Sequence, residues 1–208
     1  MFMRSILLKA SSTECALLLN GDLSILVRKI NINSKCELPI DVYLYCTKEK
    51  PYLSRIDDDK FELTLIEKPF TEGYVKDFNT LNGKIVAKFT LTKVEHLYEY
   101  QVDGYGSDYE IASESLKEEE LLEKCCLSYS ALCDYLGDIN NGYAWFIDTD
   151  SLVIFDKPKE LKDFRYYWCG SAWQKEGCHG MYCDFCEKFA RPLNKAPKTF
   201  YYVRYRNA

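Results

Sequence analysis

The stretch GKIVAKFTLTKVEHLY, residues 83–98, decides the fold class. After a glycine suited to a turn, larger apolar side chains recur at every second position, which is the period of a β-strand. One face would carry Ile85, Ala87, Phe89 and Leu91, and the other Lys84, Val86, Lys88 and Thr90. The stretch therefore predicts a strand, and a strand is stable only beside partner strands from elsewhere in the chain.

Further strands are predicted where β-branched and apolar residues cluster. They cover residues 5–10, 23–30, 40–47, 143–156 and 199–206. Helices are predicted over 11–20, which Asn20-Gly21 would end, and over 128–137, which Gly137 would end. Ser115 and Glu118 have the spacing of a capping box and predict one more helix. Many short strands, few helices and no βαβ rhythm predict an α+β chain, built as a small β-barrel with helices over its openings.

Length and composition suggest a single domain over residues 1–208. Insertions are expected at about 51–82 and 99–137, and a cysteine-rich, zinc-knuckle-like insertion at 165–195. A hydrophobic fraction of 47% is enough for a packed core. The N-terminus has no long apolar region typical of a signal peptide, and no run is long enough to cross a bilayer. We therefore expect a cytoplasmic protein whose thiols stay reduced and which makes no membrane contact.

The charge is unevenly distributed along the chain. Residues 157–208 contain eleven Lys and Arg against five Asp and Glu, whereas the preceding residues contain sixteen against twenty-seven. Between 95 and 123, ten acidic residues face a single basic one, Lys117. Phosphates would be repelled there, so only a local basic patch could bind nucleic acid.

Four cysteines fall within one short window, and they predict a structural zinc site. They are Cys169, Cys178, Cys183 and Cys186. Two residues separate the last pair, which lets both thiolates reach one tetrahedral ion. His179 could replace one cysteine ligand, and the spacing matches neither ferredoxin pattern of iron–sulfur ligands. The alternative is that these are ordinary thiols, because the chain has ten cysteines and a free cysteine often serves as a small core hydrophobe.

Several segments, taken in order, resemble the ASCH domain, a relative of the PUA fold, particularly its bacteriophage-type members. They are SILL…LLLNGDLSILVRK (5–29), PIDVYLYCTK…NGKIVAKFTL (39–91), GYAWFI…LVIFDKPKELKDF (142–164) and KAPKTFYYV (195–203). The resemblance implies a pseudobarrel of about five or six strands with flanking helices. It also implies a cleft between the first helix, the following turn and the next strands. If the chain is phage-encoded, we expect it in the cytoplasm of a bacterial host. In the family, that cleft is associated with RNA binding and, in some members, with ribonuclease or modified-nucleoside amidohydrolase activity.

At the family's motif the chain keeps Gly21, Ser24 and Arg28, but it departs at two charged positions. Leu23 stands where members have lysine, and Leu26 where they have glutamate. Hydrolysis would need a base or a charged electrophile beside the Ser24 hydroxyl. We therefore predict a binding module without catalytic residues and without a small-molecule cofactor.

The predicted contacts for RNA or another partner are basic and polar residues of this cleft and of the C-terminal half. They are Lys9, Ser24, Arg28, Lys29 and Arg165. The leading hypothesis is contact with RNA or a ribonucleoprotein. One alternative is a viral, anti-CRISPR-like inhibitor of a host nucleic-acid-processing protein, since acidic residues could mimic nucleic acid toward a basic partner. A residual ribonuclease or amidohydrolase of the ASCH type is the second alternative.

Overall fold

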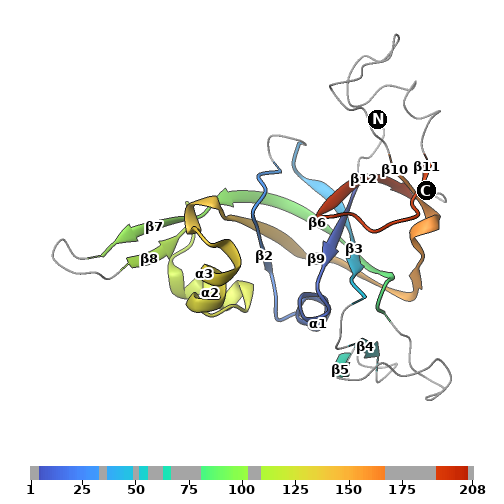
Figure 1. The fold of residues 1–208 in the computed structure, drawn as a ribbon, viewed down its shortest axis with the longest axis horizontal. Helices are drawn as coiled ribbons and strands as arrows, with labels where there is room; N and C mark the ends of the chain where they lie inside the picture. Colours follow the sequence, from blue (N-terminus) through green and yellow to red (C-terminus); the bar gives the residue numbers. More distant parts are fainter. Residues whose placement is uncertain are drawn as a thin grey trace, which may run out of the picture. The chain divides into compact units, whose positions relative to one another are not determined.

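The computed structural model describes residues 5–32, 37–48, 52–55, 63–66, 81–102, 109–166 and 191–205. They form an α+β chain whose main sheet mixes parallel and antiparallel pairs (Figure 1). The strand order in that sheet is β11-β10-β12-β1-β3-β6-β9-β2. The chain divides into two compact units. Unit 1 comprises Met1–Ala16, Asp41–Lys88 and Val153–Ala208, and unit 2 comprises Leu17–Ile40 and Phe89–Leu152.

Unit 1 is built around β1 (Ser5–Ala10), which pairs in parallel with β3 (Ile40–Cys46) and antiparallel with β12 (Phe200–Tyr205). Beyond β12 lie β10 (Phe164–Tyr166) and β11 (Arg191–Pro192). β6 (Ile85–His96) and β9 (Tyr143–Lys159) pass from one unit into the other. The core of unit 1 is buried and rich in aromatic residues; it comprises Leu7, Tyr43, Tyr45, Ile85, Phe164, Leu193 and Val203.

A capping box begins α1 (Ser12–Asn20) directly after β1. The Glu14 amide donates to Ser11 Oγ at 3.1 Å, and the Ser11 amide donates to Glu14 Oε2 at 2.8 Å. These reciprocal bonds satisfy amides that a helix start leaves unpaired. Within the expected insertion at 51–82, β4 (Tyr52–Arg55) and β5 (Leu63–Ile66) form an antiparallel pair.

Unit 2 consists of β2 (Ile25–Arg28), its antiparallel partner β9, and the elements of the expected insertion at 99–137. Those elements are β7 (Tyr98–Gln101), β8 (Tyr109–Ala112), α2 (Glu118–Cys125) and α3 (Tyr129–Leu136), followed by the short helix η1 (Ile139–Asn141). Figure 1 shows α2 and α3 beside the β7–β8 hairpin, and α2 packs on β8. One apolar core joins them, which includes Leu97, Ile111, Leu121, Leu132 and Ala144, all fully buried.

The predicted barrel is wrong, because the main sheet is open. In the described part of the chain, β11 and β2 are its two edges. Closing a barrel requires the edge strands to pair along their length. β11 has two residues and β2 has four, so each offers too few backbone groups for such a seam. Within the described residues, the strands hydrogen-bonded into this sheet number eight.

The capping box predicted at Ser115 is wrong as well. α2 begins at Glu118, with Lys117 as its N-cap and no side-chain cap. The Ser115 hydroxyl instead donates to Glu95 at 2.9 Å, and the Glu118 carboxylate accepts from the Ile111 amide of β8 at 2.8 Å. Both side chains are therefore taken by partners from outside the helix.

The alternation of β6 continues to Leu91 and then breaks. Val94 and Glu95, which are adjacent, are both buried. Val86, on the predicted polar face, is also buried, because neighbouring elements cover both faces there. In the described ranges, no helix has the length and apolar character needed to cross a membrane.

Candidate nucleic-acid interface

Two arginines are direct neighbours across strands at one end of unit 1. The register pairs Arg165 of β10 with Arg204 of β12, and Arg165 is exposed. An exposed guanidinium can bind a phosphate through paired N–H donors. Arg165 therefore marks a candidate phosphate site.

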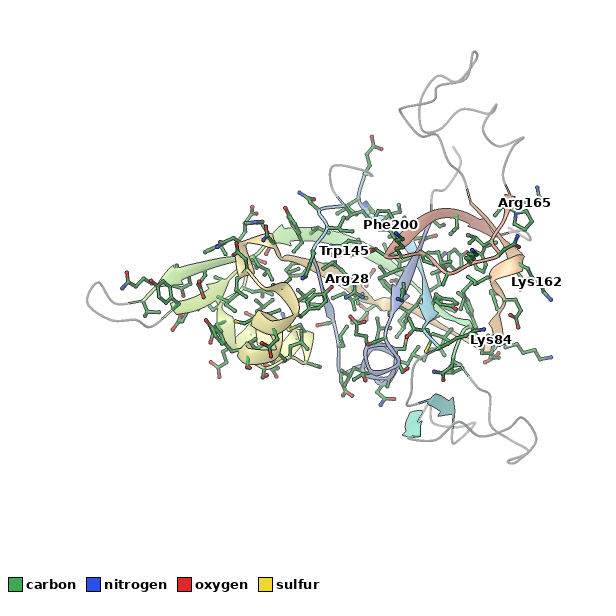
Figure 2. The ribbon with its side chains drawn as sticks, viewed as in Figure 1. Arg28, Lys84, Trp145, Lys162, Arg165 and Phe200 are labelled. Carbon is green, nitrogen blue, oxygen red and sulfur yellow. The ribbon has the colours of Figure 1, made fainter. Side chains whose placement is uncertain are left out.

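A third cation, Lys162, lies in the short helix η2 (Leu161–Asp163) that leads into β10, and it is exposed. Figure 2 shows Lys162 and Arg165 at the same end of unit 1. The two acidic residues of this turn have partners of their own. Glu160 forms an ion pair with Lys84, and Asp163 Oδ2 accepts from the Glu160 amide at 2.9 Å. The Glu160 carboxylate is therefore paired with a cation from outside the turn, and the Asp163 carboxylate is bound within it.

Lys9 extends the basic surface of unit 1 along β1. Its side chain is exposed, and its amide donates to the Thr199 carbonyl at 2.9 Å. That bond places Lys9 beside the segment that contains the exposed Lys195 and Lys198. The whole of unit 1 has twenty-one Lys and Arg against sixteen Asp and Glu, a net charge of +5.

The other three predicted contacts belong to unit 2. Ser24 is half-buried, and its backbone bonds to Lys124 and Ile147, with N···O distances of 3.0 Å. Lys29 is exposed, and its ammonium lies 5.5 Å from the centre of the Tyr135 ring. Unit 2 has six Lys and Arg against sixteen Asp and Glu, a net charge of −10. These residues therefore lie in a strongly acidic unit.

Arg28 differs from the other predicted contacts because it is buried, with 5% of its surface exposed. Its Nη1 donates to the Val27 carbonyl at 2.7 Å. Figure 2 labels it on β2, beside β9 with its fully buried Trp145. Trp145 donates from Nε1 to the Ile30 carbonyl at 3.1 Å. The guanidinium thus belongs to the interior of unit 2.

Leu23 and Leu26, the two leucines singled out in the sequence, are also core residues. Leu23 is 3% exposed and Leu26 is 1% exposed, and Leu26 is the register partner of Trp145. Their burial accounts for the apolar side chains at these two positions. The hydroxyl of Ser24 therefore gains neither a base nor an electrophile from these two positions.

Glu95 is a buried carboxylate that the sequence analysis did not identify. The only sequence signal for it is the break in the alternation of β6 after Leu91. Its Oε2 accepts from the hydroxyls of Ser113 at 2.5 Å and Ser115 at 2.9 Å, and from the Ser115 amide at 3.1 Å. Lys93 forms an ion pair with Oε1. Burial raises the pKa of Glu95, but the Lys93, Ser113 and Ser115 contacts outweigh burial and lower the pKa below its ordinary value. A charged carboxylate held by so many donors fixes the 113–115 loop and is a poor general base.

The predicted zinc ligands Cys169, Cys178, Cys183 and Cys186, together with His179, lie outside the described residues, so the zinc site stays a prediction. Among the residues that are described, no cluster of three or more His, Cys, Asp or Glu could hold a metal ion. Cys15, Cys46 and Cys125 are buried free thiols, as expected for core hydrophobes. Burial raises the pKa of Cys125 to about 11, which keeps that thiol protonated and unreactive.

The fold and the candidate site together define an α+β protein with a basic unit and an acidic unit. No protein-family model matches the sequence, and no curated protein does either. A function must therefore be argued from the charges and exposed groups of each unit.

Proposed function

We propose that the protein is a non-catalytic module that contacts RNA through the exposed cations of unit 1. The exposed Arg165 carries this proposal, because it presents a guanidinium on the surface of a unit with a net charge of +5. Arginine binds phosphate groups through paired N–H donors. The exposed Lys162 adds another positive charge at the same end.

The sequence resemblance to phage-type ASCH domains supports RNA over other phosphate-bearing partners. An ASCH-like origin of this fold, with the sheet left open, is part of the proposal. The resemblance would place the RNA contact in the cleft that contains Arg28. Here Arg28 is buried and unit 2 is acidic, so we propose a different place for that contact. We therefore assign the contact to Lys9, Lys162 and Arg165 of unit 1.

Burial of Leu23 and Leu26 supports the non-catalytic part of the proposal. In hydrolysis by a hydroxyl nucleophile, a neighbouring group must remove the proton of the hydroxyl. Here the positions that would supply charge beside Ser24 are packed in the core. RNA should therefore remain intact after prolonged incubation with the protein, which a denaturing gel would reveal.

The test compares two arginines in one assay. Fluorescence anisotropy of a labelled, mixed-sequence single-stranded RNA should show saturable binding that weakens with salt. Arg165→Ala should weaken binding by roughly threefold to tenfold and reduce the slope of log affinity against log salt by about 0.7, the value for one lost phosphate contact. Arg28→Gln should lower the melting temperature and leave the RNA affinity of the folded protein unchanged.

Lys117→Ala is the matched control, since it removes one positive charge from unit 2 without touching unit 1. Absence of binding at low salt would contradict the proposal. Equal losses for Arg165→Ala and Lys117→Ala would show that only net charge matters. Cleavage of the RNA would contradict the claim that the protein is non-catalytic, but it would leave the claim of RNA binding intact.

A further inference from the structure

The β7–β8 hairpin of unit 2 exposes aromatic residues that most globular proteins would bury. Every residue of β7 is exposed, so neither face of this strand is covered along its whole length. In the described part of the chain, six large apolar or aromatic side chains are exposed, and four of them belong to the hairpin and its end. They are Tyr98 at 39%, Tyr100 at 36%, Val102 at 44% and Tyr109 at 49%. A cluster of this kind is typical of an interaction surface.

The tyrosines are held in place before any partner arrives. Tyr98 and Tyr100 stand two residues apart on one face of the hairpin, with ring centres 6.2 Å apart. The Tyr98 hydroxyl donates to the Ser113 carbonyl at 3.2 Å, and the Tyr100 hydroxyl donates to Glu110 Oε2 at 2.7 Å. Rings that are already fixed lose little conformational entropy on binding, which is why tyrosine is common at interfaces.

The hairpin also has a firm base. Ile111 of β8 is fully buried in the core of unit 2, and its amide donates to Glu118 of α2. On β7, the Glu99 carboxylate accepts from the hydroxyl of Tyr129 in α3 at 3.0 Å. The exposed rings are therefore attached to a folded core through both helices.

The charge around these rings selects the chemistry of the partner. Residues 98–102 and 109–123 contain seven glutamates and a single basic residue, Lys117. Such a surface repels phosphates and attracts cations. Tyrosine faces also bind ammonium and guanidinium groups, as the Lys29 ammonium on the Tyr135 ring already illustrates within this unit.

We propose that the β7–β8 hairpin is a docking surface for an arginine- and lysine-rich segment of a partner protein. The tyrosine rings receive the cationic side chains, and the surrounding glutamates neutralise them. This inference stands on unit 2 alone and does not depend on RNA binding by unit 1.

The test uses the full-length protein and a fluorescein-labelled peptide of alternating arginine and serine, with a glutamate–serine peptide as the charge-reversed probe. The arginine peptide should bind saturably and the glutamate peptide should not. The double variant Tyr98→Ser, Tyr100→Ser keeps the charge and should weaken binding about tenfold, because it removes aromatic anchors. Tyr135→Ser is the matched control, since Tyr135 is 44% exposed on α3, outside the hairpin.

Four outcomes would overturn the proposal. One is the absence of binding at low salt. Another is an unchanged affinity of the hairpin double variant, which would mean that the peptide senses only the overall charge; an equal loss for that variant and for Tyr135→Ser would mean that the hairpin rings have no special role. The fourth is self-association of the protein in sedimentation velocity that the hairpin variant abolishes, which would assign the surface to a second copy of the chain. The RNA affinity of the hairpin variant, measured by fluorescence anisotropy, should match that of the unchanged protein. A failure of the peptide-docking proposal can therefore be distinguished from a failure of the RNA-binding proposal.

Discussion

The two units share the strands β6 and β9 but expose opposite chemistry. Unit 1 has a net charge of +5 and places exposed cations at the η2–β10 turn and along β1. Unit 2 has a net charge of −10 and exposes tyrosines among carboxylates. The net charge of −5 for the whole chain describes neither the basic surface of unit 1 nor the acidic surface of unit 2. Arguments about partners from net charge hold only for each unit taken separately.

A pair of arginines makes the same contrast at the scale of single residues. Arg165 is exposed in unit 1 and opposes another arginine, while Arg28 is buried in unit 2. Each arginine directly follows an apolar strand residue, Val27 or Phe164, so the local sequence does not distinguish them. Burial therefore separates an arginine that can meet a ligand from one that stabilises the interior.

The largest effect is expected at the cysteine window of unit 1. We predict a structural zinc held by Cys169, Cys178, Cys183 and Cys186. The double variant Cys183→Ser, Cys186→Ser should release it and strongly lower the thermal stability, because the binding free energy of structural zinc, on the order of 10 kcal/mol in small domains, is also folding free energy. RNA binding should fall, whereas peptide binding at the hairpin should be less affected. Elemental analysis and thermal unfolding provide the measurements.

Cys133→Ser is the control for that variant, since Cys133 is a half-buried thiol of unit 2. It should retain the metal and the melting temperature. Zinc content near zero in the folded, unchanged protein would refute the site.

The next effect tests whether the units unfold together. Phe164 in unit 1 and Trp145 in unit 2 are both fully buried. Truncation of either to alanine should cost about 3–5 kcal/mol of unfolding free energy. Because β6 and β9 run through both units, we expect a single transition that shifts in both variants. Urea unfolding followed by fluorescence and by far-UV circular dichroism would reveal a second transition if the units are independent.

A smaller effect is expected at Glu95, which fixes the loop that leads into α2. Glu95→Gln should cost about 1–3 kcal/mol at neutral pH, because it disturbs buried hydrogen bonds to a charged group. Folding lowers the pKa of Glu95 below its ordinary value of 4.5. The ionised carboxylate therefore stabilises the folded protein at pH values above 4.5. That stability is lost as pH falls through the lower, folded-state pKa.

The stability difference between the unchanged protein and Glu95→Gln should therefore shrink as the pH falls below 4.5. The exposed Glu119→Gln serves as the control and should have little effect at any pH. A difference that persists at low pH would mean that the shape of the side chain matters more than its charge.

Local patterns predicted the elements well. The strand at 5–10 has the predicted bounds, β3 differs from its prediction by one residue at one end, and β12 by one residue at each end. α3 ends at Gly137, where a positive φ of 74° suits glycine. These features depend on neighbours along the chain, which a single sequence displays directly.

Contacts between distant residues could not be predicted in the same way. Ser115 looks like a helix cap, but Glu95, twenty residues away, binds its hydroxyl. The opposition of Arg165 to Arg204 depends on the register of β10 and β12, which no local pattern encodes. The open edges of the sheet follow from how short β2 and β11 are, and sequence reasoning places strand ends poorly.

The interleaving of the two units along the chain has a consequence for inheritance. Unit 1 comes from three separate segments and unit 2 from two, with crossings inside α1, β3, β6 and β9. A single proteolytic cut releases neither unit, and a single recombination event cannot exchange one of them for a foreign module. The basic surface and the acidic hairpin are therefore bound to evolve as one gene product, each constrained by the strands that it shares with the other.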